Sequence, residues 1–459
     1  MTSPANTRLP ISDDVEAVLP AAISRAHDWL KSTADEEDKA TEQLADLLRD
    51  EDGVKFTMDF VDRVMRPEDD KVAAHALKDI SSHYDPSFLG SINGALVGAG
   101  GFFGPILPNL VMPVARLYMR KMVGHLVLDA ESDALNKILD KAAESGEQLN
   151  LNLLGEAVLG EEEAKSRAER TLKLIQNPRV TYVSVKASSM VAQLNQWDID
   201  GSVERLKERL RPLYEEAARR NPQVFINMDM EEYHDLHLTI RLFKELMSEP
   251  EFKNLESGIV LQAYLPDTFD ALKDIAEFAK QRVAEGGAKV KVRIVKGANL
   301  SMENVQSEVH DWPLATYTNK LDVDANYYRL LDFILREEYA DSVRIGVATH
   351  NLYTAAMAYE LGKKRGVLHM MDSEMLQGMS PAQQAAVRKV FEGRQILYTP
   401  VVHADDFDVA VSYLVRRLEE NSAPQNFLYA LFAPGEEPLA DQEETFRRAV
   451  AKRWDTFAG

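Results

Sequence analysis

The chain has 459 residues, of which 45% are hydrophobic, and its formal net charge at pH 7 is −21. This length and apolar content suffice for one large domain and a second, smaller one. The negative charge argues against general binding to nucleic acid, which depends on lysine and arginine side chains that neutralise phosphates. The sequence contains no cysteine. Disulfides, thiolate metal sites and a cysteine nucleophile are therefore excluded within this chain, and redox chemistry requires a bound cofactor.

The N-terminal part of the chain is predicted to be helical. Residues 1–20 are mixed and partly acidic. They lack a basic start followed by an apolar core, so no secretory signal is expected and the predicted compartment is the cytoplasm. Residues 1 to about 85 are rich in Ala, Leu, Glu, Asp and Lys, and the apolar residues of 40–48 recur at helical spacing. This pattern predicts a helical arm.

Residues 86–115 contain no charged residue, which raises the hypothesis of a membrane span. Repeated glycines and prolines, among them Gly100, Gly101 and Pro105, would interrupt a single helix. A buried or surface-docking helical segment is the alternative. An apolar surface of this extent also predicts peripheral contact with the inner face of the cell membrane.

From residue 148 onward, apolar strand candidates alternate with segments of helical periodicity, such as 203–220 and 267–285. The strand candidates are residues 149–155, 180–187, 224–230, 258–264, 290–296, 343–349, 367–372 and 396–402. Regular alternation predicts a parallel α/β sheet. Eight units favour a closed (βα)8 TIM-like barrel, and no G-x-G-x-x-G fingerprint of a doubly wound sheet occurs. We divide the chain into a helical region, residues 1–145, and a barrel domain, residues 146–459.

The predicted strands end in functional groups. The apolar run 292–298 contains Arg293 and Lys296, and burying such charges without a partner is costly. Both are therefore expected at a strand end that faces an anionic or electron-rich group. The same pattern places Lys186, Asp229, Gln262, Thr349 and His350 at the ends of other strands. Each one alone has a structural explanation: a solvated strand end for Lys186, a helix cap for Asp229, a hydrogen-bonded structural histidine for His350. Together they predict an active site at the carboxyl ends of the barrel strands.

The last predicted helix of the barrel carries two arginines. In the segment 411–420, one set of apolar residues has the spacing of a face that packs on the barrel. A second set with the same spacing is Tyr413, Arg416, Arg417 and Glu420. It is either an exposed face supported by the pair of Arg416 with Glu420, or a clamp in which guanidinium groups bind a substrate carboxylate.

Nine short motifs between about residues 150 and 430 resemble, in order, those of the flavin-dependent proline dehydrogenase family. They are 153–157, 183–186, 229–232, 261–264, 292–298, 348–351, 375–379, 398–401 and 413–421. The chain is similar in particular to the corresponding domain of bifunctional proline utilization A proteins. This resemblance implies a distorted (βα)8 barrel that binds FAD and oxidises L-proline to 1-pyrroline-5-carboxylate in proline catabolism. Hydride would pass to the flavin N5, and electrons onward to a membrane quinone.

The resemblance also implies a role for each matching residue. The cofactor set is Arg293 near the flavin N5, with Met230, Gln262, Lys296, Gly297, Ala298, Thr349 and His350 around the flavin and its phosphates and Glu420 towards the adenosine. The substrate set is Lys186, Arg416 and Arg417 for the carboxylate, Asp229, Leu376 and Tyr398 for the ring pocket, and Glu156 as a gate with the second arginine. Asp229 is expected near Lys186. A cation near N5 would stabilise the reduced, anionic flavin. No metal is expected.

The chain departs from the family pattern in two places: the aromatic pair after residue 298 is replaced, and more residues separate Tyr398 from Arg416 than in many relatives. Asn299 and Leu300 stand where the family often has an aromatic pair, so stacking by that pair is absent or supplied elsewhere. The chain has neither the cysteine nor the length for an aldehyde dehydrogenase domain, so the reaction is expected to stop at pyrroline-5-carboxylate. A barrel lysine, Lys296 or Lys186, could instead serve a Schiff-base aldolase. Alternatively, residues 86–115 carry a docking or scaffold function and the barrel is inert.

Overall fold

The computed structural model describes most of the predicted barrel and parts of the N-terminal region. The described residues are 13–33, 51–65, 67, 69–84, 108–109, 111–114, 127–130, 133–155, 158, 160–195, 197–403, 410, 413, 417, 420–421, 423–433, 435 and 437–455.

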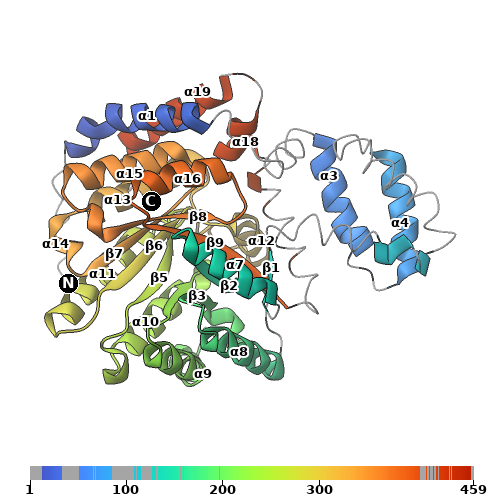
Figure 1. Ribbon diagram of the computed structural model, residues 1–459, viewed down its shortest axis with the longest axis horizontal. Coiled ribbons are helices and arrows are strands. Elements are labelled where there is room, and N and C mark those ends of the chain that lie inside the picture. Colours follow the sequence, from blue (N-terminus) through green and yellow to red (C-terminus); the bar gives the residue numbers. More distant parts are fainter. Residues whose placement is uncertain are drawn as a thin grey trace.

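The core of the molecule is a closed parallel barrel (Figure 1). Its strands are β2 (Gln148–Leu153), β3 (Tyr182–Lys186), β4 (Phe225–Asp229), β5 (Ser257–Gln262), β6 (Val290–Val295), β7 (Val343–Ala348), β8 (Met371–Leu376) and β9 (Gln395–Val402). Each strand pairs in parallel with its sequence neighbours, and β9 closes the barrel by pairing with both β8 and β2. A two-residue strand, β1 (Leu128–Asp129), adds to the far end of β9. The predicted TIM-like fold is confirmed.

One predicted strand is shifted along the chain. Residues 368–370 form a short 3-10 helix, and β8 runs from Met371 to Leu376 instead of over 367–372. The prediction followed the apolar run that begins at Val367. The actual strand carries Asp372, Ser373 and Glu374, which are all buried. Cationic partners inside the barrel stabilise the two buried carboxylates, and a periodicity argument does not detect such partners.

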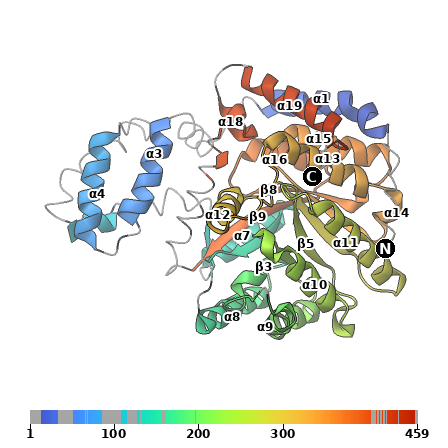
Figure 2. The same ribbon diagram turned by 180° about the vertical axis from the view of Figure 1, so that it is seen from behind.

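Helices connect successive strands and cover the outside of the barrel (Figures 1 and 2). They are α7 (Asp133–Glu144), α8 (Glu161–Gln176), α9 (Ile199–Arg219), α10 (Leu236–Met247), α11 (Thr268–Ala284), α12 (Leu300–His310), α13 (Lys320–Ile334), α14 (Glu337–Ala340), α15 (Leu352–Lys364), α16 (Pro381–Val390), α18 (Phe427–Phe432) and α19 (Glu437–Lys452). The helices predicted over 203–220 and 267–285 correspond to α9 and α11. Most apolar side chains of the helices and strands form one large core, and a smaller cluster gathers Val402 of β9 with Leu428 and Phe432 of α18.

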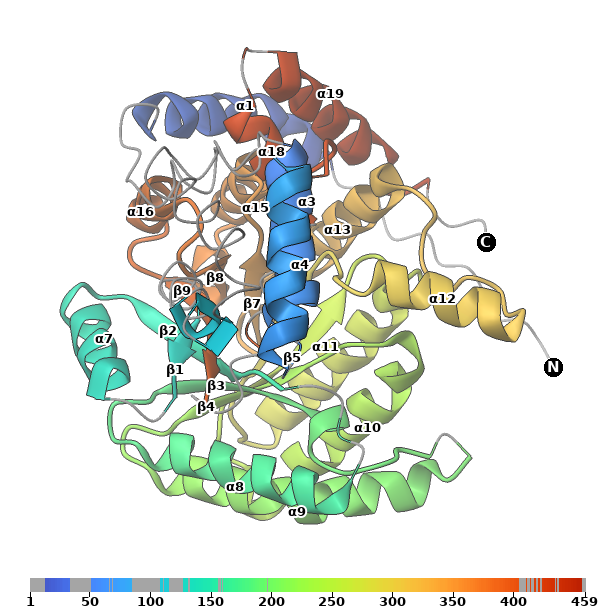
Figure 3. The same ribbon diagram turned by 90° about the vertical axis from the view of Figure 1, so that its right-hand side faces the viewer.

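The N-terminal region is helical, as predicted, but it divides into two parts. Helix α1 (Asp14–Thr33) packs against α15, α16 and α19 on the outside of the barrel. Helices α3 (Glu51–Phe60) and α4 (Asp70–His83), joined by the π-helical turn η1 (Val61–Met65), share a small apolar core of their own. Figure 3 shows α3 and α4 in front of the barrel, on the side where α12 follows β6.

The helix predicted at 40–48 lies outside the described residues, as does most of the uncharged segment 86–115. Residues 108–109 and 111–114 of that segment are helical; Met112 is buried and Val114 is 66% exposed. Among the described residues, no helix combines the length and the apolar character that a membrane span requires.

Candidate active site

Most of the predicted site residues lie at one end of the barrel. Four strands end in a predicted site residue: β3 in Lys186, β4 in Asp229, β5 in Gln262 and β8 in Leu376. Arg293 lies in β6 and Tyr398 in β9, while Thr349 and His350 directly follow β7. Met230, Lys296, Gly297 and Ala298 follow β4 and β6. The strands are parallel, so these groups gather at the barrel end where active sites of this fold are built.

Arg293 lies in the barrel interior, because its contacts come from strands that are not its neighbours in the sheet. Its Nε donates to Glu374 Oε2 on β8 at 2.6 Å, and its guanidinium carbon lies 4.8 Å from the centre of the Tyr398 ring. Within the described part of the chain, the two Nη groups make no hydrogen bond. Burial alone would lower the pKa of Arg293, but the carboxylates of Glu374 and Asp229 outweigh burial and raise it. A permanent cation therefore presents free donors at the strand ends.

Asp229 is a buried acceptor at the end of β4, two strands away from Arg293 in the sheet. Tyr398 Oη donates to its Oδ2 at 2.8 Å, and Asn227 Nδ2 and Ser184 Oγ donate to its Oδ1 at 2.8 and 3.1 Å. Burial raises the pKa of Asp229, against the opposing charges of Arg293 and Lys186. The side chain points into the barrel, so the helix-cap explanation does not hold for it.

Lys186 forms an ion pair with a carboxylate that the sequence analysis did not single out. Its Nζ lies 2.5 Å from Glu231 Oε1, and Ser188 Oγ donates to the other oxygen of Glu231 at 2.9 Å. Asp229 is the register partner of Lys186 on the next strand. It contributes to the field around Lys186 but forms no ion pair with it. Asp229 thus lies near Lys186, as expected, and the ion pair that holds the lysine is formed by Glu231.

Lys296 belongs to a cationic pair. Its Nζ lies 2.5 Å from Asp324 Oδ1, and Lys320 contacts the other oxygen of the same carboxylate. Burial lowers the pKa of Lys296 to about 8, with Asp324 opposing this effect. Two ammonium groups share one carboxylate, so a positive charge remains available for an anion such as a phosphate. Gly297 follows with a φ of +125°, and a Cβ there would lie 2.4 Å from the Tyr264 ring. Only glycine fits this turn.

His350 and Gln262 are held by backbone groups. His350 Nε2 accepts from the backbone N–H of Leu376 at 2.8 Å, which requires that nitrogen to be unprotonated. Burial, and next the charge of Arg417, lower the pKa of His350 to about 4. Gln262 Nε2 donates to the Glu231 carbonyl oxygen at 2.9 Å. Met230 is buried beside this group of residues.

Of the C-terminal arginines, the structure describes Arg417. Its Nη1 donates to Glu420 Oε2 at 2.6 Å, and its guanidinium carbon lies 5.1 Å from the centre of the Tyr413 ring. Burial opposes the charge of Arg417, but Tyr413 and Glu420 together raise its pKa. Glu420 thus pairs with Arg417, and the expected pair of Glu420 with Arg416 involves a residue outside the described ones. Arg416 and Glu156 lie outside the described residues.

Sequence reasoning missed three carboxylates that hold the cations of the site. Glu374, Glu231 and Asp324 contact Arg293, Lys186 and Lys296. A usable signal existed: each buried cation at a strand end needs a counter-charge. The sequence did not show which of the many acidic residues supplies it. Among the described residues, no cluster of acidic and histidine side chains suits a metal ion.

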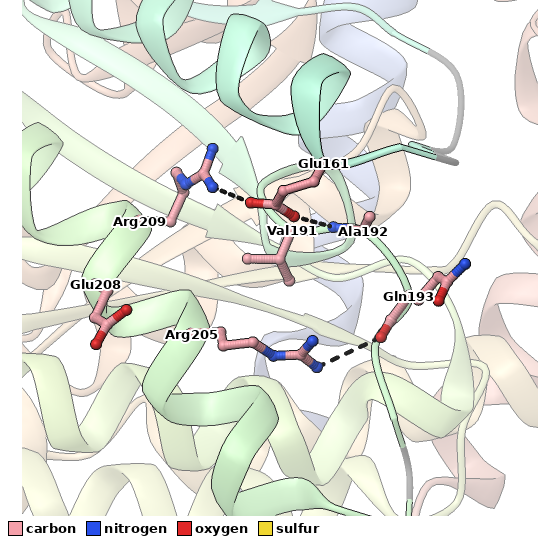
Figure 4. A pocket seen from close by; sticks show the side chains of 7 residues that line it. All are labelled: Glu161, Val191, Ala192, Gln193, Arg205, Glu208 and Arg209. Atoms are coloured by element: carbon pink, nitrogen blue, oxygen red, sulfur yellow. Dashed lines mark hydrogen bonds and ion pairs between the residues drawn. The ribbon is translucent and has the colours of Figure 1, made fainter.

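A surface hollow of about 670 Å³ lies away from this site, between α8, α9 and the turn after β3 (Figure 4). Arg209 contacts Glu161, which also accepts from the Ala192 backbone N–H. Arg205 extends towards the Gln193 carbonyl oxygen. These groups already satisfy one another across an open, polar surface. We assign no catalytic role to this hollow.

Comparison with known proteins shows what family this arrangement represents. A family model described as proline dehydrogenase matches residues 134–430. The chain belongs to the proline dehydrogenase family. Proline utilization A from Corynebacterium freiburgense is 48% identical with a TM-score of 0.73, and the match covers 97% of this chain and 36% of that one. The protein of the same name from Bdellovibrio bacteriovorus is 27% identical with a TM-score of 0.75, and covers 94% of this chain and 44% of that one.

These proline dehydrogenase relatives are much longer than the matched region. The chain spans 36% and 44% of the two relatives named above. A variant of proline utilization A from Bradyrhizobium japonicum is 20% identical with a TM-score of 0.67, which supports the fold alone. A search of curated proteins found no match.

Proposed function

We propose that this chain oxidises L-proline to 1-pyrroline-5-carboxylate with bound FAD, and that electrons pass on to a membrane quinone. The observation that carries the proposal is Arg293, a permanent cation whose Nη donors have no hydrogen-bond partner among the described residues. Family membership supports the reaction class. The Bdellovibrio relative is described as inactivated by N-propargylglycine, which is itself an amino acid.

The residues present fit a flavin dinucleotide. Gln262, Arg293 and His350 come from or directly follow three adjacent strands, β5 to β7. Lys296 and Lys320 leave a positive charge beside Asp324 that suits a pyrophosphate. When bound, FAD would supply the hydride acceptor. Arg293 would favour the negative charge of the reduced state.

The substrate side of the site follows from the remaining residues. Arg417 and Lys186 supply cations for the proline carboxylate, with Arg416 as a further proposed donor. Tyr398 and Leu376 lie next to each other on β9 and β8 and offer a wall for the ring. Asp229 fixes the Tyr398 hydroxyl. Fixed donors and walls of this kind would convert an encounter with proline into a positioned reaction.

The test is an absorption spectrum. Protein reconstituted with FAD should show flavin absorbance near about 450 nm, and anaerobic L-proline should bleach it. L-proline methyl ester, which lacks the carboxylate, is the matched control and should bleach it far more slowly. The proposal would be wrong if the protein failed to bind FAD, or if the native cofactor released from it were FMN.

A second candidate function rests on Lys296. Burial lowers its pKa to about 8, and such a lysine is a better nucleophile for a Schiff-base aldolase. The ion pair with Asp324 opposes this role because it favours the charged form. Borohydride treatment in the presence of carbonyl compounds decides: a covalent adduct on Lys296 would favour the aldolase, and its absence together with proline-dependent bleaching would favour the flavoenzyme.

A further inference from the structure

The interior of this barrel is charged directly beneath the proposed flavin site. Barrel interiors are usually filled by branched apolar side chains. Here Lys291 of β6 is fully buried, with its Nζ 2.6 Å from Glu374 Oε1 and 3.0 Å from Asp372 Oδ2. None of the three is among the residues expected to contact substrate or cofactor. A buried lysine and two buried carboxylates carry a large desolvation cost, so their presence calls for a function.

Glu374 connects Lys291 to the active site. One of its oxygens, Oε1, faces Lys291, and the other, Oε2, accepts from Arg293 Nε at 2.6 Å. Lys291 and Arg293 both lie on β6, two residues apart, and therefore face the same side of the strand. Their separate contacts to the two oxygens fix the orientation of the carboxylate, and with it the orientation of the guanidinium.

The backbone around this pair is adapted to it. Gly346 of β7 lies opposite Arg293 in the sheet. A Cβ at Gly346 would lie 2.2 Å from Glu374 Oε1 and 3.0 Å from Lys291 Cε. A separation that short would displace one of the two side chains. The absence of a side chain at Gly346 is therefore what allows Lys291 and Glu374 to meet.

The charges in this cluster decide what Lys291 does for Arg293. Without Lys291, the full charge of Glu374 would act on Arg293, and Asp372 would be left with Arg344 at 2.8 Å as its cation. Removing a cation from a site of low dielectric makes the local potential more negative. The nearby charge of Glu374 would then largely cancel the positive charge that Arg293 presents to a bound flavin.

We propose that Lys291 is a positioning residue for Arg293: by holding one oxygen of Glu374, it keeps that carboxylate from cancelling the charge that Arg293 presents to the flavin. The inference rests on the proposed function, because it assigns the effect to a bound flavin. Lys291 does not touch the reacting atoms. It acts through Glu374 on the orientation of the Arg293 guanidinium and on the net charge around it.

The reduction potential of the bound flavin tests this role, because a purely structural lysine would not move it. Lys291→Met should make the potential more negative, since the reduced, anionic flavin loses stabilisation. Glu374→Gln, which keeps the shape of the side chain, should make it more positive. The double variant should resemble Glu374→Gln, because Lys291 acts through Glu374 and has little left to act on once that carboxylate is neutral. Turnover with proline should fall roughly 10- to 100-fold in Lys291→Met, as expected when a positioned group is misplaced.

The matched control is Lys289→Met, two residues earlier in the chain. Lys289 Nζ donates to the Ala340 carbonyl oxygen outside the site, so its replacement should leave the flavin potential unchanged. An unchanged potential in a folded, flavin-loaded Lys291→Met variant would overturn the proposal. If that variant does not fold, Glu374→Gln decides, and a potential equal to or below that of the parent protein would overturn it. A parent protein that binds no FAD would overturn the proposed function and this inference together.

Discussion

Asp229 shows how a single buried carboxylate serves the proposed reaction. It accepts from Tyr398, Asn227 and Ser184, so its removal frees a tyrosine hydroxyl at the ring pocket. Asp229→Ala should therefore lower the rate with proline by about 10²-fold or more and leave the flavin spectrum nearly intact. Steady-state kinetics normalised to bound flavin measure this, with the exposed Asp341→Ala as control. A variant that loses flavin and thermal stability together but keeps its rate per flavin would show that Asp229 is structural.

His350 makes stability depend on pH. Burial and the nearby Arg417 lower its pKa to about 4, whereas an unfolded chain binds the proton near about pH 6.5. The unfolded state is therefore favoured as the pH falls from about 6.5 towards about 4, and the loss levels off below that because both states are then protonated. The contribution of His350 to this loss is on the order of 3 kcal/mol.

Urea unfolding at about pH 7 and about pH 4.5 isolates this contribution. The variant His350→Gln keeps an acceptor for the Leu376 N–H but has no proton to bind, so its stability should fall less on acidification. His369→Gln, at an exposed histidine, should behave as the parent protein does. Equal acid sensitivity of the His350 variant and the parent would contradict the prediction.

At the scale of elements, helix α1 is an integral part of the barrel's outer layer. Its buried face includes Trp29, which is 4% exposed, and Arg25 Nε pairs with Glu360 of α15 at 2.5 Å. Trp29→Ala should lower the free energy of unfolding by about 3–5 kcal/mol, the usual cost of such a cavity. Trp197 is 99% exposed, and Trp197→Ala should change stability by less than about 0.5 kcal/mol. If Trp29→Ala lowered the free energy of unfolding no more than Trp197→Ala, α1 would not be docked on the barrel in solution.

The sequence predicted the elements whose apolar pattern agrees with their environment. The run around Arg293 marked both β6 and the site, because a charge inside an apolar strand has few explanations. β8 was displaced by several residues, since its buried Asp372 and Glu374 interrupt the pattern that defines a strand. One of the two, Glu374, is also among the three carboxylates that sequence reasoning missed at the site. Counter-charges come from distant parts of the chain, and only the folded barrel shows which cation each one meets.

At the scale of the whole molecule, the proposed quinone acceptor requires contact with a membrane. The segment 86–115 carries no charge, and its Val114 is 66% exposed. Val114→Asp should therefore reduce proline oxidation with vesicle-embedded quinone more than oxidation with a soluble dye. Val72 of α4 is similarly exposed, at 57%, and Val72→Asp is the matched control. An equal loss with both acceptors would argue against a docking role for the segment.

The closure of the barrel through β9 has a consequence for synthesis on the ribosome. β2 ends at Leu153, whereas its second neighbour, β9, begins at Gln395. At usual elongation rates of about 5–20 residues per second, the interval between them is on the order of tens of seconds. During that time β2 presents an unpaired strand edge, and such an edge can pair with other chains. Helix α1 must also wait for α15 and α19 to emerge. The nascent chain thus depends on protection of the free edge of β2 until β9 has been made.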